Sequence, residues 1–127
     1  MKQITHTLLG CALAALLPLA AHADKPTPAS GQEIEHLITQ LKSSGCEFQR
    51  NGSWYDSAKA ADHLRQKYDY LLKKYGPVTA EDFIANAGSE SSMSHKPYQV
   101  RCAGQASVAS GPWLQAELRR YRSGAGK

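Results

Sequence analysis

The chain has 127 residues, with 15 Lys and Arg against 11 Asp and Glu, and therefore a formal net charge of +4. This length suits a single domain, and mild basicity is compatible with an anionic partner or with simple solubility. No nucleic-acid-binding motif occurs, which excludes nucleic acid as the expected partner. The sequence also lacks a phosphate-binding loop and a dinucleotide fingerprint, so we expect no cofactor.

The first 23 residues are predicted to be a cleavable signal peptide. Lys2 gives a positive start, residues 8–21 are apolar, and the small residues Ala21 and Ala23 fit cleavage after Ala23. The apolar run is too short for a membrane span, so we expect no transmembrane segment in the mature chain. The stretch that ends at Cys11 also resembles a lipoprotein signal, and lipidation of Cys11 is the alternative to its removal.

Two cysteines remain after such a cleavage, Cys46 and Cys102. An exported protein meets an oxidising environment, in which a pair of thiols tends to form a disulfide. Closing the long loop between them would stabilise the fold by roughly 4 kcal/mol in the chain-entropy model. A metal or redox role is the alternative, but neither cysteine has C-x-x-C spacing. We therefore expect a disulfide between Cys46 and Cys102.

After the signal peptide we expect a lead-in, one domain and a tail. Residues 24–29 carry two prolines without periodicity and are predicted to be a disordered lead-in. The single domain is predicted to span 30–122, and the tail to cover 123–127. No internal repeat or second domain is visible in the sequence.

Two long helices are predicted, over 31–44 and 57–75. The first follows a capping-box pattern S-x-x-E that starts at Ser30. The second follows Asp56, a favoured N-cap residue, and ends before a Gly-Pro pair. Its apolar stripe at helical spacing comprises Ala58, Ala61, Leu64, Tyr68, Leu71, Leu72 and Tyr75.

A β-hairpin is predicted between the two long helices. Asn51-Gly52 favours a type I′ turn, which needs positive φ at both central residues. The flanking alternation predicts arms at 46–50 and 53–55, and a similar alternation predicts a third strand over 97–102. Because a lone hairpin is marginal in water, the hairpin needs further strands or helices packed against it.

The remaining segments supply two helices and two loops. A short third helix is predicted after Thr79, and a fourth opens at 110–112, where proline suits a first turn. Residues 89–96 form a polar loop and 103–110 a loop of small residues. The predicted fold class is α+β, with four helices packed around a small two- or three-stranded antiparallel sheet and one disulfide.

One face of the second long helix is predicted to be cationic. His63, Lys67, Tyr70 and Lys74 recur at i, i+4, i+7 and i+11, opposite the apolar stripe. A solvated surface is the ordinary interpretation, and a docking strip for an anionic partner is the functional one. The candidate binding surface combines this face with the neighbouring loops and comprises Arg50, His63, Lys67, Tyr70, Ser91, Ser92 and Lys96.

Two alternative functions follow from other features of the sequence. A small serine-dependent hydrolase could use a hydroxyl of the 89–96 loop with His63 or His95, although no G-x-S-x-G or S-x-x-K motif occurs. A structural envelope protein acting as an oligomer would instead need an exposed apolar patch. The histidines lack metal-ligand spacing, so we expect no metal site. We also expect no catalytic residues. The oligomeric state is left open.

Five ordered blocks of the sequence resemble the YfeK-like family, small exported proteins of Gram-negative bacteria. The blocks are CEFQRNGSWY at 46–55, AADHLRQKY at 60–68, TAEDFI at 79–84, SSMSHKPYQVRC at 91–102 and WLQAEL at 113–118. The resemblance implies one compact periplasmic domain of unknown function, without an activity or catalytic residues. The family pattern has a glycine before Lys-Pro-Tyr. This chain has His95 there, so either the glycine turn is absent or His95 adopts an unusual φ.

Together these features predict an exported, periplasmic binding or interaction module without catalytic activity. Its expected partner is an unknown envelope protein or an anionic ligand.

Overall fold

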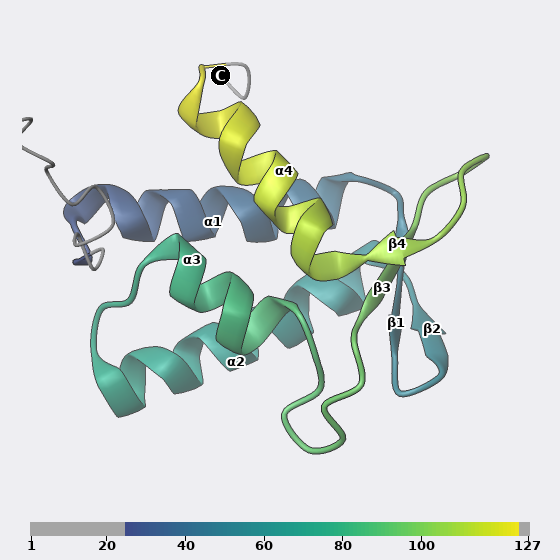
Figure 1. The fold of residues 1–127 in the computed structure, drawn as a ribbon, viewed down its shortest axis with the longest axis horizontal. Helices are drawn as coiled ribbons and strands as arrows, with labels where there is room; N and C mark the ends of the chain where they lie inside the picture. The colour runs from purple at the N-terminus through teal and green to yellow at the C-terminus, as the bar shows by residue number, and fades with distance from the viewer. Residues whose placement is uncertain (1–24, 125–127) are drawn as a thin grey trace, which may run out of the picture.

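The computed structural model describes residues 25–124, and it has an α+β architecture of four α-helices and one four-stranded antiparallel sheet (Figure 1). The predicted signal peptide, Cys11 and the last three residues of the tail lie outside the described residues. Within residues 25–124, no helix is both long and apolar enough to cross a membrane.

The two long helices are α1, Pro28–Ser43, and α2, Ser57–Tyr75. α1 begins earlier than the predicted start at 31, because the chain turns into the helix at Thr27, whose N–H donates to Ser30 Oγ at 2.9 Å. The proline that follows suits the first turn, where its missing N–H would have no helical partner. Asp56 caps α2 as predicted, with its carboxylate accepting a first-turn N–H at 2.8 Å.

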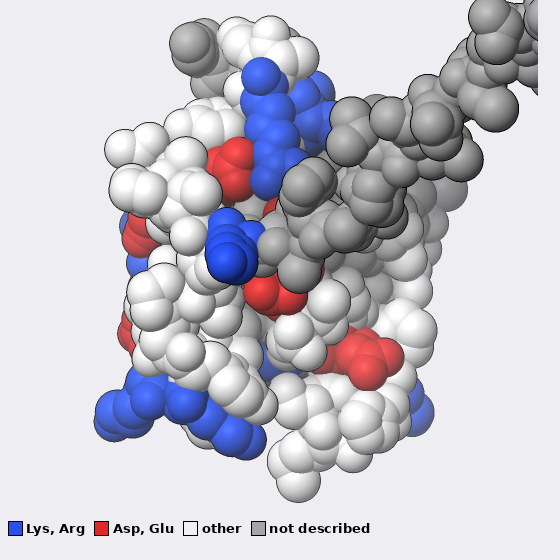
Figure 2. Space-filling model, turned by 60° about the vertical axis from the view of Figure 1, so that its left-hand side comes forward, with Lys and Arg blue, Asp and Glu red and all other residues white. Residues whose placement is uncertain are grey.

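The core lies between the helices and the inner face of the sheet. Its largest fully buried side chains are Ile34, Leu37, Leu41, Phe48, Leu64, Phe83, Ile84, Tyr98, Val100 and Leu114. The predicted stripe on α2 is confirmed at Ala61, Leu64, Tyr68 and Leu71. Ala58 and Leu72 are exposed because they lie at the margins of the stripe, and Tyr75 is exposed on the last turn. Most charged side chains lie on the surface, as Figure 2 shows for one end of the molecule, whereas Glu117 is buried.

Two shorter helical segments complete the helical layer. Helix α3, Ala80–Phe83, continues directly into a wide π turn, η2, Ile84–Gly88, and helix α4 covers Ser110–Arg122. A Cβ at Gly88 would lie 2.5 Å from Leu114 Cδ1, so glycine lets η2 pack closely against α4. In Figure 1, α4 crosses α1.

The sheet has the strand order β2-β1-β3-β4, and all neighbouring strands are antiparallel. Strands β1, Glu47–Arg50, and β2, Ser53–Tyr55, form the predicted hairpin, and β3, Gln99–Arg101, is the predicted third strand in shortened form. The fourth strand, β4, Val108–Ala109, corrects the prediction of a loop over 103–110 and of only two or three strands. Two residues are too few to show the alternation that identifies a strand.

Two tight turns contain non-glycine residues at positive φ. Asn51 (φ 50°) and Gly52 (φ 85°) form the turn of the hairpin, as predicted. His95 has φ 60°, so this histidine adopts the unusual conformation that was one of the two outcomes expected from the resemblance. Its N–H donates to Ser91 O at 2.9 Å, which closes the turn of the 91–95 loop.

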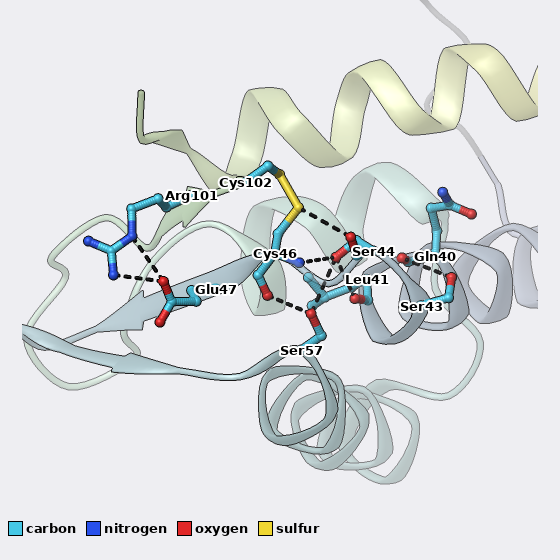
Figure 3. The surroundings of a disulfide bond; sticks show 9 residues. All are labelled: Gln40, Leu41, Ser43, Ser44, Cys46, Glu47, Ser57, Arg101 and Cys102. Carbon is cyan, nitrogen blue, oxygen red and sulfur yellow. Dashed lines mark hydrogen bonds and ion pairs between the residues drawn. A yellow bond between two sulfur atoms is a disulfide. The ribbon is translucent and has the colours of Figure 1, made fainter. Parts of the chain in front are cut away.

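The predicted disulfide between Cys46 and Cys102 is present (Figure 3). Cys46 directly precedes β1 and Cys102 directly follows β3, so the bond joins two neighbouring strands at one end of the sheet. Ser57 Oγ, at the start of α2, donates to the carbonyl oxygen of Cys46, and Cys46 N–H donates to Ser44 Oγ at 3.0 Å. The disulfide therefore joins β1 to β3, while the hydrogen bonds of Cys46 connect the start of the hairpin to both long helices.

Candidate functional site

Three of the predicted binding residues meet around the hydroxyl of Tyr98. Arg50, at the end of β1, places Nη1 2.7 Å from His63 Nδ1 on α2. The other ring nitrogen of His63 lies 3.1 Å from Tyr98 OH, and Lys67, one turn further along α2, donates to the same oxygen at 3.0 Å. We call Arg50, His63, Lys67 and Tyr98 the Tyr98 cluster.

Tyr98 is the fixed point of this cluster. Its backbone N–H donates to Ser89 O and its carbonyl oxygen accepts from the N–H of Ser110, both at 2.9 Å. The ring packs against Phe48 with centroids 4.9 Å apart, and the residue is 1% exposed. A buried tyrosine needs a partner for its hydroxyl, and here the hydroxyl extends to α2 and meets His63.

Arg50 Nη1 lies close to both ring nitrogens of His63, 2.7 Å from Nδ1 and 3.3 Å from Nε2, so the guanidinium lies against the imidazole. Tyr98 OH bonds to His63 Nε2 and accepts a hydrogen bond from Lys67. Lys67 Nζ donates as well to the carbonyl oxygen of Glu90 at 3.0 Å. Neutral groups thus hold both cations in place.

The electrostatic environment keeps His63 neutral at pH 7. Burial, together with the charges of Arg50 and Lys67, lowers the pKa of His63 to about 4. Burial lowers the pKa of Lys67 to about 8, with Glu90 raising it and Arg50 lowering it further. Burial raises the pKa of Tyr98. At pH 7 the cluster therefore combines a neutral imidazole and a neutral phenol with two positive charges.

The two positive charges of the cluster lack the carboxylate partners that four other arginines have. Arg65, Arg101, Arg120 and Arg122 each pair with a glutamate at 2.5 to 3.1 Å. Within residues 25–124, neither Arg50 nor Lys67 forms an ion pair, and the carboxylate of Glu90 contacts His95 instead, at 3.2 Å. Like charges held close together without a counter-ion repel each other, which disfavours their charged forms. An anion placed between them would relieve this repulsion.

A cleft of about 310 Å³ opens beside the cluster, between the hairpin and the first half of α2. Arg50 and His63 belong to both the cluster and the cleft. The cleft is lined by Phe48, Arg50, Tyr55, Lys59, Ala60, Asp62, His63 and Gln66.

Ser91, another predicted binding residue, has a structural position. It is 5% exposed, and its hydroxyl accepts from the N–H groups of Met93 and Ser94, both at 3.3 Å. Asn51 Nδ2 lies 3.5 Å from the same hydroxyl, and Ser94 Oγ donates to Asn51 Oδ1 at 2.6 Å. These bonds connect the 91–95 loop to the turn of the hairpin that carries Arg50.

The other three predicted binding residues lie apart from the Tyr98 cluster. Ser92 and Lys96 are exposed on the loop, and Tyr70 is 58% exposed further along α2. Lys74 Nζ lies 5.6 Å from the centre of the Tyr70 ring. Among the described residues, no hydrogen bond or ion pair links these three side chains to the Tyr98 cluster.

The contact required by the hydrolase alternative is not formed between residues 25 and 124. His63 bonds to Arg50 and Tyr98, and His95 bonds to Glu90. The hydroxyls of Ser89, Ser91 and Ser94 bond to backbone groups or to Asn51. In the same part of the chain, no three His, Cys, Asp or Glu side chains are grouped so that they could hold a metal ion.

Two residues of the site were missed by sequence reasoning, Tyr98 and Lys59. Lys59 lies one turn before His63, so extending the cationic face back by one turn would have included it. Tyr98 falls within the third strand predicted over 97–102, and a buried phenol on a strand signals a polar partner nearby. That this partner is His63 depends on how the sheet packs against α2.

Comparisons with known proteins give a family but no activity. No curated protein and no solved structure matches the chain. The YfeK-like name and the periplasmic location are not part of the family match, and both stay predictions. A family model matches residues 28–122, which cover the helices and the sheet described above, and the chain therefore belongs to DUF5329, a family of unknown function.

Proposed function

We propose that the mature chain is an exported, periplasmic binding module that holds an anionic ligand or an acidic envelope partner through Arg50 and Lys67, without catalysing a reaction. His63 and Tyr98 position the two cations. The observation that carries this proposal is that two partly buried cations, close enough to affect each other's electrostatics, are held by neutral groups without an ion pair among the described residues.

The geometry supports binding more than catalysis. The ring nitrogens of His63 contact Arg50 and Tyr98, so both nitrogens are occupied. A general base needs a free nitrogen within reach of a substrate proton. Arg50 has the planar donor groups that suit a carboxylate or phosphate, and Lys67 adds a second charge.

Affinity capture from an envelope extract tests the proposal, with residues 24–127 as bait. Lys67→Glu places a negative charge in the cluster, and Lys73→Glu makes the same change on the exposed last turn of the same helix. We expect wild type and Lys73→Glu to retain the same partner and Lys67→Glu to lose it at least tenfold. Circular dichroism checks that the three proteins are equally folded.

The same partner retained by all three proteins would overturn the proposal. Salt gives an independent readout, because an interaction between exposed charges weakens as ionic strength rises. Capture that is unchanged between low salt and about 0.5 M salt would count against an anionic partner in the same way.

Export is tested separately from binding. We expect the chain recovered from a periplasmic extract to begin at Asp24, as read by mass spectrometry of its N-terminal peptide. Recovery of an intact chain beginning at Met1 in the cytoplasmic fraction would contradict this part of the proposal.

A further inference from the structure

The cleft beside the Tyr98 cluster has the size and lining of a small-molecule site. Its volume of about 310 Å³ is at the lower end of the range for ligand pockets, which combine apolar walls with a few polar groups. The wall formed by α2 presents Lys59, Asp62, His63 and Gln66, spaced at i, i+3, i+4 and i+7 on one helix face.

The opposite wall comes from the inner face of the hairpin. Phe48 and Tyr55 are direct partners across β1 and β2, and Arg50 lies two residues beyond Phe48 on the same face. Phe48 and Ala60 are buried, at 1% and 2% exposure, and form the apolar part of the lining together with the Tyr55 ring. This lining suits the apolar body of a ligand.

Arg50 connects the apolar and the charged parts of the cleft. Its guanidinium carbon lies 5.0 Å from the centre of the Tyr55 ring, while Nη1 contacts His63. The aromatic face and the imidazole therefore orient the guanidinium, and neither neutralises it. An arginine oriented in this way is suited to a carboxylate attached to a planar group, because the carboxylate binds the fork and the plane can stack on an aromatic neighbour.

The charges of the lining indicate a ligand with a single negative charge. Arg50 and Lys59 are cations, Asp62 is the only carboxylate of the lining, and His63 is neutral at pH 7, which leaves a net charge of +1. Within residues 25–124, none of the three charged residues forms an ion pair. A phosphate monoester carries about −1.5 to −2 at pH 7, so a monocarboxylate matches this lining better.

We propose that this cleft binds a small organic monocarboxylate with a flat apolar body, whose carboxylate is held by Arg50 and Lys59. This inference rests on the proposed function, because Arg50 belongs to both sites, and it deepens that function by naming the chemical class of the ligand. Gln66 lies at the exposed margin of the cleft, where it can donate to or accept from a further polar group of the ligand.

Titration of residues 24–127 with four probes tests the ligand class, followed by NMR of the backbone amides. Benzoate has a flat ring and a carboxylate, benzyl alcohol lacks the charge, acetate lacks the ring, and inorganic phosphate has a different anionic group. We expect saturable shifts around Arg50, Tyr55 and Lys59 with benzoate, and at least tenfold weaker binding of the other three probes. Equal binding of acetate or benzyl alcohol, or tighter binding of phosphate, would overturn the proposal.

Three variants separate the contributions of charge and shape. Arg50→Gln removes the guanidinium and is expected to weaken benzoate binding at least tenfold. Gln66→Trp fills the mouth of the cleft, keeps every charge, and is expected to weaken benzoate binding to a similar degree. Lys73→Gln removes a charge from the same helix outside the cleft and is expected to change the affinity less than twofold. Unchanged binding by Gln66→Trp would show that the carboxylate binds elsewhere.

The outcomes distinguish this inference from the function on which it rests. If partner capture depends on Lys67 while benzoate does not bind, the anionic partner stands and the ligand class is wrong. If benzoate binds in a manner that depends on Arg50 while capture is insensitive to Lys67→Glu, the cleft stands and the role of the full cluster is wrong.

Discussion

Arg122 and Arg50 show two ways in which this protein uses an arginine. Arg122, on the last turn of α4, donates to Glu33 of α1 and to Glu81 of α3, with N–O distances from 2.6 to 3.1 Å. These bonds raise the pKa of Arg122 and lower that of Glu81. Among the described residues, Arg50 meets only a histidine and an aromatic ring.

The difference indicates separate roles for the two arginines. Arg122 joins three helices, so its contacts account for its position by stability alone. The contacts of Arg50 leave its charge uncompensated by any described carboxylate, and charged groups in such surroundings are candidates for ligand binding. This difference in roles can be tested by removing the disulfide, removing each arginine in turn, and lowering the pH so that His63 becomes protonated.

Removal of the disulfide should have the largest effect on stability. This loss should be concentrated in the sheet that carries Arg50. The double variant Cys46→Ala/Cys102→Ala loses the bond that joins β1 to β3, without leaving a free thiol. We expect the free energy of unfolding to fall by about 2–4 kcal/mol, as is typical of native disulfides, measured by urea unfolding.

Hydrogen exchange locates this loss in the structure. We expect faster exchange in β1 and β3 and little change in α4 around Arg122. Unchanged stability, or a uniform increase in exchange, would show that the disulfide does not specifically support the hairpin.

Replacement of Arg122 by Gln should have the next largest effect. It removes the contacts to Glu33 and Glu81, and Glu33 is only 14% exposed, so its carboxylate loses a partner in a partly buried place. We expect a loss of about 1–2 kcal/mol in the free energy of unfolding and no change in benzoate affinity. Arg119→Gln, on the same turn of α4, is the matched control and should change stability by less than about 0.5 kcal/mol.

Acidification should destabilise the protein through His63. The pKa of His63 is about 4 in the folded protein and 6.5 in an unfolded chain, so between these values the unfolded state binds the proton and the folded state does not. Stability should therefore fall as the pH is lowered from 6.5 towards 4. We expect a contribution of about 1 kcal/mol at most, because water screens the partly exposed ring.

Comparison with two histidine variants isolates this effect from the carboxylates that titrate in the same range. His63→Gln should show a smaller loss of unfolding free energy than wild type between pH 6.5 and pH 4. His95→Gln removes an exposed histidine and should retain the wild-type slope. Identical slopes in wild type and His63→Gln would contradict the assigned surroundings of His63.

Replacement of Arg50 by Gln should have the smallest effect on stability. Unlike the replacement of Arg122, it should mainly change the pKa values of neighbouring groups. Removal of Arg50 takes away a charge that lowers the pKa of both His63 and Lys67. We expect the free energy of unfolding to change by less than about 0.5 kcal/mol and the pKa of Lys67 to rise, as followed by NMR of its side chain. A loss as large as that of Arg122→Gln would show that Arg50 is structural.

The fold was largely predictable because most of its elements have local signals. The helical spacing of apolar residues and the cap at Asp56 predicted α2, and Asn51-Gly52 predicted the hairpin. Local signals were weaker at the ends of elements: α1 begins before Ser30, earlier than predicted. They failed altogether for β4. A strand of two residues has no pattern of its own and exists because β3 offers it a partner.

The candidate site was predicted only in part. Arg50, His63 and Lys67 were chosen for charge and helical spacing, and the structure brings these three together. Ser91, chosen for its hydroxyl, is a buried acceptor of backbone N–H groups, a position that sequence alone cannot distinguish from an exposed one.

The sequence by itself determined the helices, the hairpin turn and the two cysteines available for a disulfide, because these depend on neighbours along the chain or on composition. Only the tertiary structure decided that Tyr98 lies against His63, that Lys67 reaches the Tyr98 hydroxyl, and that Arg50 has no carboxylate partner among the described residues. These features depend on contacts between segments far apart in sequence, and the positions of such segments are set by packing of the whole core.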